Sequence, residues 1–227
     1  MTASPTTPTY KPPPMPRWSP RPASPSRQLG FSDLALSLSG VGLAVFMVMH
    51  MGLLASALLG AATMNALAEF LERYYLLQIG VVGLVPLLLI HSVVSLRKLP
   101  TSVRQQWEVV SGIRSLRHLD TWTWALQIGT ALAILILTSI HLWVVLTTLP
   151  IEAEKSGLRV FQTYWWFYAP FIVVVEAHIS IGLYRAAVKW GLLARWPAHL
   201  ALLAWTAVFL LLGFAILVNF YLLGGAS

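Results

Sequence analysis

Five long apolar stretches determine what this chain can fold into. They cover residues 31–58, 74–97, 122–148, 162–187 and 197–223. Each is longer than the ~20 residues that a helix needs to cross the ~30 Å hydrocarbon core of a bilayer. Because lipid offers the backbone no hydrogen-bond partner, each stretch is expected to form a helix, with Pro86 and Pro170 as kink sites. The sequence therefore predicts an all-α membrane protein, a bundle of five transmembrane helices within residues 30–227.

The composition narrows the function classes. Only 10% of the 227 residues are charged and 57% are hydrophobic, whereas soluble domains carry about 25% charged residues. We therefore exclude a water-soluble enzyme, a disordered regulator and a nucleic-acid binder, despite the net charge of +7. The chain has no cysteine, which excludes thiol catalysis, disulfides and iron–sulfur clusters held by this chain. The six histidines are the remaining ligands for a soft or borderline metal.

The charged residues predict a tail and an orientation. Residues 1–29 hold nine of the 14 prolines and are expected to form a disordered cytoplasmic tail, because they cannot bury apolar surface. If this tail is cytoplasmic, 12 of the 15 lysines and arginines lie on the cytoplasmic side. Cytoplasmic loops of membrane proteins carry this excess. The N-terminus is therefore predicted inside and the C-terminus outside.

Four histidines lie within the apolar stretches, each on a different predicted helix: His50, His91, His141 and His178. With a rise of ~1.5 Å per residue, His50 and His141 fall toward the outer face, whereas His91 and His178 fall toward the cytoplasm. The two levels are ~14 Å apart. Two stacked imidazole pairs suit two b haems, whose irons would have no open position and would carry electrons. We therefore expect an outer haem between His50 and His141 and an inner haem between His91 and His178.

Other interpretations of these histidines remain open. A zinc or copper site would gather the imidazoles at one height, which fits these positions less well. A proton-coupled transporter would use Glu176 and the histidines as a relay, although its usual internal symmetry is not visible. Ser39 and Gly182 are small residues on the faces of His50 and His178, and they either make room for a flat macrocycle or simply allow close helix packing.

Three carboxylates and two further histidines are candidate site residues. Glu176 lies inside a predicted helix and serves either a proton relay or a packing hydrogen bond. Glu69 and Glu72 precede the second helix at the outer edge, where they would accept a proton from a hydroquinone or act as solvated loop residues. His118 and His199 lie at the cytoplasmic side, where each contacts a haem propionate or only the membrane interface.

Several spaced motifs carry a family resemblance. They are Val175-Glu176-Ala177-His178 running through Gly182-Leu183-Tyr184-Arg185 to Val188-Lys189-Trp190-Gly191, His91 followed by Arg97-Lys98-Leu99-Pro100, Arg117-His118-Leu119-Asp120-Thr121 followed by His141-Leu142, and Phe46-Met47 running to His50-Met51. Together they resemble the dihaem cytochrome b subunit of the succinate:quinone oxidoreductases, in the menaquinol:fumarate reductase group. The resemblance covers nearly all of residues 31–223.

The resemblance implies a function. It implies an electron-transfer anchor in the bacterial inner membrane that carries two b haems with the ligand pairing given above. Menaquinol would react at the outer side, and a flavoprotein and an iron–sulfur subunit would dock on the cytoplasmic side and hold the fumarate or succinate chemistry. The sequence leaves the number of complexes per assembly open, with a dimer of complexes as one alternative. The runner-up within this class is the cytochrome b anchor of a hydrogenase or formate dehydrogenase.

The resemblance also assigns residues. Glu69 or Glu72 would be the proton acceptor at the quinol site, and Glu176 would belong to a transmembrane proton path. Contacts to the inner haem propionates would come from Ser37, Trp124 and Lys189, and His118 is added as a cofactor-binding candidate by its position in the basic loop.

Overall fold

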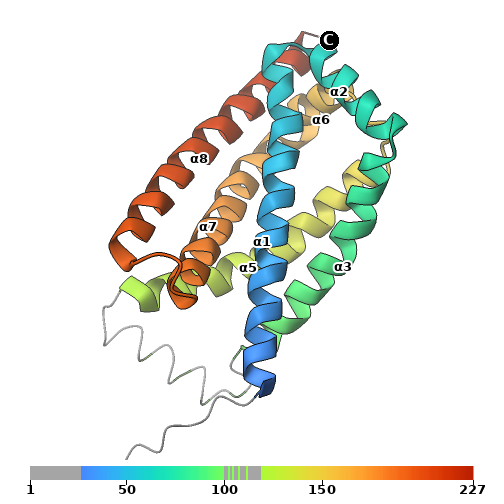
Figure 1. The fold of residues 1–227 in the computed structure, drawn as a ribbon. Coiled ribbons are helices and arrows are strands. Elements are labelled where there is room, and N and C mark those ends of the chain that lie inside the picture. Colours follow the sequence, from blue (N-terminus) through green and yellow to red (C-terminus); the bar gives the residue numbers. More distant parts are fainter. Residues whose placement is uncertain are drawn as a thin grey trace, which may run out of the picture.

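The chain folds into a helical bundle in a computed structural model that describes residues 27–99 and 119–226, together with positions 102, 104, 107 and 111. The described residues contain no strand. Their helical elements, shown in Figure 1, are α1 (Arg27–Ala55), η1 (Ser56–Leu59), α2 (Ala61–Arg73), α3 (Leu76–Leu96), α5 (Leu119–Leu146), α6 (Ala153–Arg159), η2 (Val160–Tyr164), α7 (Trp165–Lys189) and α8 (Arg195–Gly225).

Within the described residues, five helical segments are long and apolar enough to cross a membrane. They are Gly30–Leu59, Leu76–Leu96, Trp122–Leu146, Ala153–Lys189 and Arg195–Gly225. The predicted all-α, five-helix architecture is therefore confirmed. Large apolar side chains cover the outside of these helices, with Val82, Leu203 and Leu211 each more than 60% exposed, as expected of a surface that faces lipid.

The fourth segment is longer than its apolar stretch predicted. We expected a helix over residues 162–187, but the helical run begins at Ala153 and passes through α6 and the π-helical turn η2 before α7. The charged residues Glu154, Lys155 and Arg159 keep α6 out of any apolar stretch. The short helix forms nevertheless because it packs closely against α8.

A second short helix, α2, lies between the first two membrane segments. It is amphipathic: Met64 and Ala68 are buried against the bundle, whereas Ala62, Glu69 and Glu72 are exposed. Because only one face of α2 is apolar, its sequence falls outside the apolar stretches. In Figure 1, α2 and α6 lie with the C-terminus at one end of the bundle, which we call the α2–α6 end. The opposite end, where α1 begins, is called the Asp33 end.

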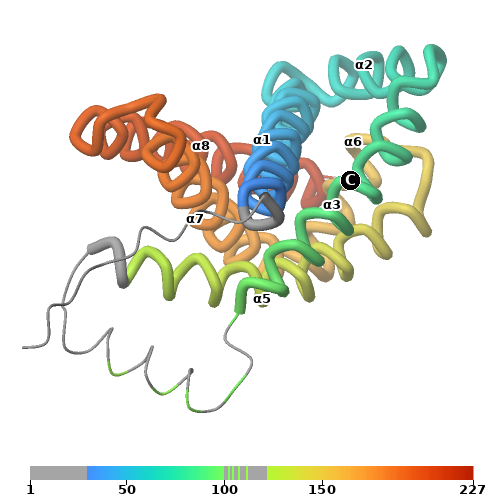
Figure 2. The backbone as a smooth tube through the Cα atoms, turned by 60° about the horizontal axis from the view of Figure 1, so that its bottom comes forward, coloured from blue at the N-terminus to red at the C-terminus, as the bar shows by residue number. Residues whose placement is uncertain are grey.

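The long helices pack in a defined set of pairs. In the end-on view of Figure 2, α1 lies between α3 on one side and α7 with α8 on the other. Further contacts join α5 to α7 and α7 to α8. The backbones of α6 and α8 approach closely, since a Cβ atom at Gly157 would lie 3.0 Å from the backbone nitrogen of Gly224. Glycine at this position therefore allows the two backbones to meet.

Buried apolar side chains concentrate at the α2–α6 end. This cluster comprises Met51, Leu53, Ala57, Met64, Ala68, Ala153, Val160, Ile216 and Phe220. By contrast, α3 buries one side chain, Leu84, along its whole length. Nearer the middle of the bundle, histidine–hydroxyl contacts join α1 to α3 and α5 to α7.

The predicted tail falls largely outside the described residues. Residues 1–26 are not among them, so their disorder stays a prediction. The first helix begins at Arg27, three residues before the boundary that the composition suggested.

Candidate functional site

The four histidines of the apolar helices form two facing pairs. His50 of α1 and His141 of α5 have ring centroids 6.0 Å apart, with ring planes at 71°. His91 of α3 and His178 of α7 have ring centroids 6.3 Å apart, with planes at 83°. The structure thus brings together the same partners that the estimated heights paired.

The spacing within each pair fits two imidazoles on opposite sides of one metal. A ring nitrogen lies ~1.1 Å from its ring centroid for ring bonds of ~1.33 Å, and metal–imidazole bonds are ~2.0–2.1 Å long. Two axial imidazoles should therefore have centroids about 6.3 Å apart. The observed distances of 6.0 and 6.3 Å match this value.

The two pairs lie at different levels of the bundle. On α1, Ser39 contacts His91 of the second pair, and His50 of the first pair follows 11 residues later. On α5, Thr130 contacts His178, and His141 again follows 11 residues later. Eleven residues correspond to ~16 Å along a helix. The His50–His141 pair is therefore nearer the α2–α6 end and the His91–His178 pair nearer the Asp33 end, stacked much as predicted.

Hydroxyl groups contact both histidines of the second pair. Ser39 Oγ lies 3.1 Å from Nδ1 of His91, and Thr130 Oγ1 lies 3.1 Å from Nδ1 of His178. Gln127 adds its amide nitrogen 3.4 Å from Nε2 of His178. Sequence reasoning missed Thr130 and Gln127, although the spacing of 11 residues between Ser39 and His50 recurs between Thr130 and His141 and is the signal that would have pointed to Thr130.

Glycines leave space beside this pair. A Cβ atom at Gly40 would lie 3.1 Å from Cε1 of His91, and one at Gly182 would lie 3.3 Å from the Gln127 amide nitrogen. Gly182 was expected either to make room for a macrocycle beside His178 or to allow close helix packing, whereas Gly40 was not singled out. A larger side chain at Gly40 would crowd the His91 ring, and one at Gly182 would crowd the Gln127 amide beside His178.

Aromatic rings surround the first pair. Phe46 stacks on His50 at a centroid distance of 6.0 Å. Tyr168 and Phe171 of α7 lie 5.8 and 5.6 Å from the ring of His141. Nδ1 of His141 is buried and has no hydrogen-bond partner among the described residues. The two pairs therefore have similar ring spacing in different surroundings, aromatic for one and lined by the Ser39 and Thr130 hydroxyls for the other.

Glu176 lies away from the histidines, at the interface of α7 with α8. Its side chain is buried and accepts a hydrogen bond from the hydroxyl of Ser180, one turn later. That hydroxyl lies 3.0 Å from Oγ1 of Thr206 on α8. His178, two residues after Glu176, faces α3 and α5 instead. Glu176 thus begins a short polar chain, of which Ser180 and Thr206 were not foreseen from the sequence.

The candidate residues of the Asp33 end form ion pairs and a hydrogen bond. Asp33 pairs with Lys98, in the turn after α3, and, at 2.7 Å, with Lys189 of α7. The indole Nε1 of Trp190 donates to Ser37 Oγ at 2.9 Å. Ser37 and Lys189 therefore lie at one end of the bundle, and Lys189 is already engaged by a carboxylate.

The remaining candidates of this side are dispersed. Trp124 is half-buried in α5. His199 of α8 lies with its ring 4.6 Å from that of Tyr184, and its Nδ1 is 2.8 Å from the carbonyl oxygen of Arg195. His118 lies outside the described residues.

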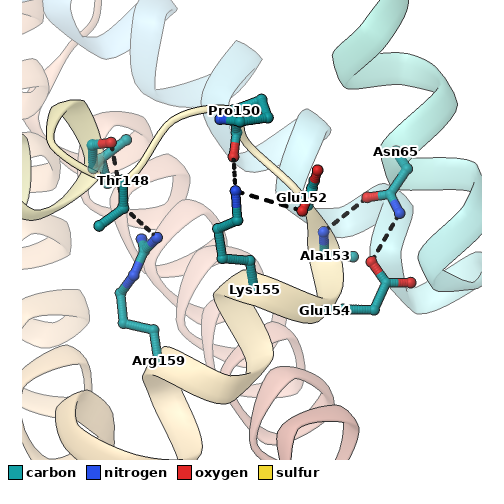
Figure 3. A network of polar contacts seen from close by, with 9 residues as sticks. Asn65, Thr148, Pro150, Glu152, Ala153, Glu154, Lys155 and Arg159 are labelled. Atoms are coloured by element: carbon teal, nitrogen blue, oxygen red, sulfur yellow. Dashed lines mark hydrogen bonds and ion pairs between the residues drawn. The ribbon is translucent and has the colours of Figure 1, made fainter. Parts of the chain in front are cut away.

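Glu69 and Glu72 lie at the α2–α6 end, on the exposed side of α2. The same end holds a polar network that joins α2 to α6, drawn in Figure 3. Asn65 accepts a hydrogen bond from the Ala153 amide at 2.7 Å and donates one to Glu154 at 2.8 Å. Further along, Arg159 donates to Thr148 at 2.6 Å.

Each histidine pair offers two imidazoles. Over the described ranges, no three His, Asp or Glu side chains gather as they would around a bare metal ion. Two axial imidazoles complete the ligand set of a haem iron, whereas structural zinc takes four protein ligands. The donor set and its spacing therefore fit a haem at each pair.

Comparison with known proteins places the chain in a family. No family model matches it. It is 37% identical, over 173 residues, to a "Fumarate reductase cytochrome b subunit" from each of two Helicobacter pylori strains, covering 70% of this chain and 66% of each relative. It is 32% identical, over 176 residues, to the protein of the same name from Wolinella succinogenes, covering 73% of this chain and 69% of the relative. The chain thus spans about two thirds of the length of these relatives, and it belongs to the family of fumarate reductase cytochrome b subunits.

Proposed function

We propose that this chain is the haem-carrying membrane anchor of a menaquinol:fumarate reductase, or succinate:menaquinone oxidoreductase, complex. The observation that carries the proposal is the pair of facing imidazoles at each of two levels, with ring spacings that fit axial coordination. The family membership supports the same function. The chain would conduct electrons across the bacterial inner membrane and would leave the dicarboxylate chemistry to a partner chain.

Two haem b groups are the cofactors of this proposal. His50 and His141 would hold one, and His91 and His178 the other. A haem held by two imidazoles would supply single-electron exchange. Helices α1 and α5 each place one residue at either level, 11 positions apart: Ser39 and His50 on α1, and Thr130 and His141 on α5. The helix rise therefore sets the distance between the two levels.

The α2–α6 end is the proposed menaquinol side. It corresponds to the outer face if the N-terminus is cytoplasmic, as the distribution of basic residues favours. Oxidation of a hydroquinone releases two protons, and a nearby carboxylate accepts one of them. Glu69 and Glu72 are the candidates, because both are exposed on α2, at the end of the bundle nearer to the His50–His141 pair.

The Asp33 end is the proposed docking side for the iron–sulfur and flavoprotein subunits. Lys98, Lys189 and Arg185 lie at this end of α3 and α7, and Asp33 balances only one of the positive charges. Ser37, Trp124, Lys189 and His118 stay the proposed contacts of the inner haem propionates, which would compete with Asp33 for Lys189. Association of two complexes as a dimer also stays a prediction.

Glu176 is the proposed proton-path residue. Its carboxyl is hydrogen-bonded to Ser180, which in turn contacts Thr206. A buried carboxyl that is linked through a hydroxyl of its own helix to a second hydroxyl on a neighbouring helix is suited to pass protons within the membrane. This chain of groups lies at the α7–α8 interface, separate from the histidine pairs, so proton movement would take a route apart from that of the electrons.

One experiment tests the proposed function. The full chain is expressed in haem-replete cells and purified with its bound partners, and a reduced-minus-oxidised spectrum is recorded before and after addition of a menaquinol analogue. We expect b-type bands that the menaquinol analogue reduces and fumarate reoxidises in the intact complex. A colourless protein would favour a proton-coupled transporter. Reduction by hydrogen or formate, with the corresponding subunits bound, would assign the chain to a different respiratory complex.

A further inference from the structure

The hydroxyls of Ser39 and Thr130, beside the His91–His178 pair, each donate a hydrogen bond to a backbone carbonyl of their own helix. Ser39 Oγ lies 2.7 Å from the carbonyl oxygen of Ala35, and Thr130 Oγ1 lies 2.7 Å from that of Leu126, one turn earlier in each helix. A carbonyl oxygen only accepts, so each hydroxyl donates its hydrogen to its own helix. At the 3.1 Å contacts, each hydroxyl oxygen is then placed to accept a hydrogen bond from Nδ1–H of the imidazole. Each ring also has a backbone hydrogen-bond partner, Leu36 for His91 and Gln127 for His178.

This arrangement selects one tautomer of each ring. In a neutral imidazole, one nitrogen carries the hydrogen and the other offers a lone pair. With the hydrogen on Nδ1, the lone pair of His91 and of His178 is on Nε2. The hydroxyls also restrict rotation of the rings, since each contact joins two different helices: α1 with α3, and α5 with α7.

The His50–His141 pair lacks this support in the part of the chain that the structure describes. Nδ1 of His141 is buried without a hydrogen-bond partner, and its neighbours are the rings of Tyr168 and Phe171. His50 is contacted by Phe46. These contacts hold ring planes by packing, and they do not distinguish between the two tautomers.

We propose that Ser39 and Thr130 are positioning residues that pre-order His91 and His178 for axial coordination through Nε2, and that this inner pair therefore binds its haem more firmly than the outer pair. The inference rests on the proposed function. Groups that accept from the second nitrogen of a metal-bound histidine typically contribute ~10–100-fold to metal-site affinity. They also raise the basicity of the ligand, which stabilises the oxidised iron.

Thr130→Val tests the proposal, because it replaces the hydroxyl by a methyl group of similar volume. In the purified full chain, we expect ~10-fold faster transfer of the inner haem to excess apomyoglobin. The midpoint potential of the inner haem should become more positive, while the outer haem keeps both its potential and its transfer rate. Thr130→Ser should restore wild-type behaviour, because it returns the hydroxyl.

A matched control lies near the end of the same helix. Thr147 Oγ1 donates to the carbonyl oxygen of Trp143 at 2.7 Å and is exposed, so Thr147→Val removes the same kind of hydroxyl away from any histidine. Ser39→Ala provides the independent test on α1, should Thr130→Val fail to fold. Unchanged transfer rate and potential of the inner haem in these variants would overturn the positioning role. A wild-type chain that binds no haem would instead overturn the proposed function.

Discussion

Asn65 is expected to hold α6 in place against α2 at the α2–α6 end. It is the acceptor for the amide of Ala153, the first residue of α6, whose side chain is 0% exposed. Helix N-termini leave such amides without intrahelical partners, and the residue before α6, Glu152, makes no side-chain cap. Asn65 therefore caps α6 from a different helix.

The cost of Asn65→Ala follows from these contacts. A buried amide that loses its acceptor costs ~1–3 kcal/mol. The exposed hydrogen bond to Glu154 adds no more than ~1 kcal/mol, as for exposed charge pairs. We expect the free energy of unfolding of the purified chain, measured by titration from mild detergent into dodecyl sulfate, to fall by about 2 kcal/mol.

Glu154→Ala is the matched control for this measurement. It removes only the exposed partner and leaves the Asn65 acceptor facing the Ala153 amide, so its cost should stay below ~1 kcal/mol. Equal losses in the two variants, or an Asn65→Ala variant as stable as wild type, would refute the capping role.

Three further perturbations follow from the described contacts. Gly157→Val should lower the free energy of unfolding by ~1–3 kcal/mol in the same titration, because its Cβ meets backbone atoms of α8 that cannot move aside. Gly83→Val, with nothing within 4 Å of the added Cβ, should lower the free energy of unfolding by less. A larger loss for Gly83→Val than for Gly157→Val would contradict this packing. Asp33→Asn should destabilise the chain by no more than ~1 kcal/mol at low salt, and the difference from wild type should shrink in 1 M salt; a salt-independent loss would argue against ion pairing with Lys98 and Lys189. Glu176→Gln should block menaquinol-coupled fumarate reduction in proteoliposomes while both haems stay bound; normal turnover would count against the proton role.

The sequence is a good guide to the heights of residues in this fold. Each long apolar stretch must become a helix in lipid, and the regular helix rise then converts position into depth. The estimated depths therefore pair His50 with His141 and His91 with His178, and the rings of these same partners face each other in the bundle.

Contacts that depend on helix rotation and on neighbours were not predictable in the same way. Whether Thr130 contacts His178, or Ser180 contacts Thr206, depends on which faces of two helices point toward each other. A membrane helix is apolar on all sides, so its hydrophobic pattern does not show which face packs against a neighbour. The ion pair between Lys189 and Asp33 was not predictable either, because depth alone does not show which carboxylate or propionate a lysine contacts. The helices α2 and α6 were not predicted because they are short and partly polar.

The haem-to-chain ratio tests the central claim most directly. The full chain, purified from haem-replete cells, should contain two haems per chain, because the structure provides two facing imidazole pairs. His141→Ala should contain one, with the remaining haem held by His91 and His178, whereas Ser139→Ala, on the exposed side of the same helix, should keep both. A wild-type chain without haem, or a His141→Ala chain that keeps two, would contradict the assignment of these histidines as axial ligands.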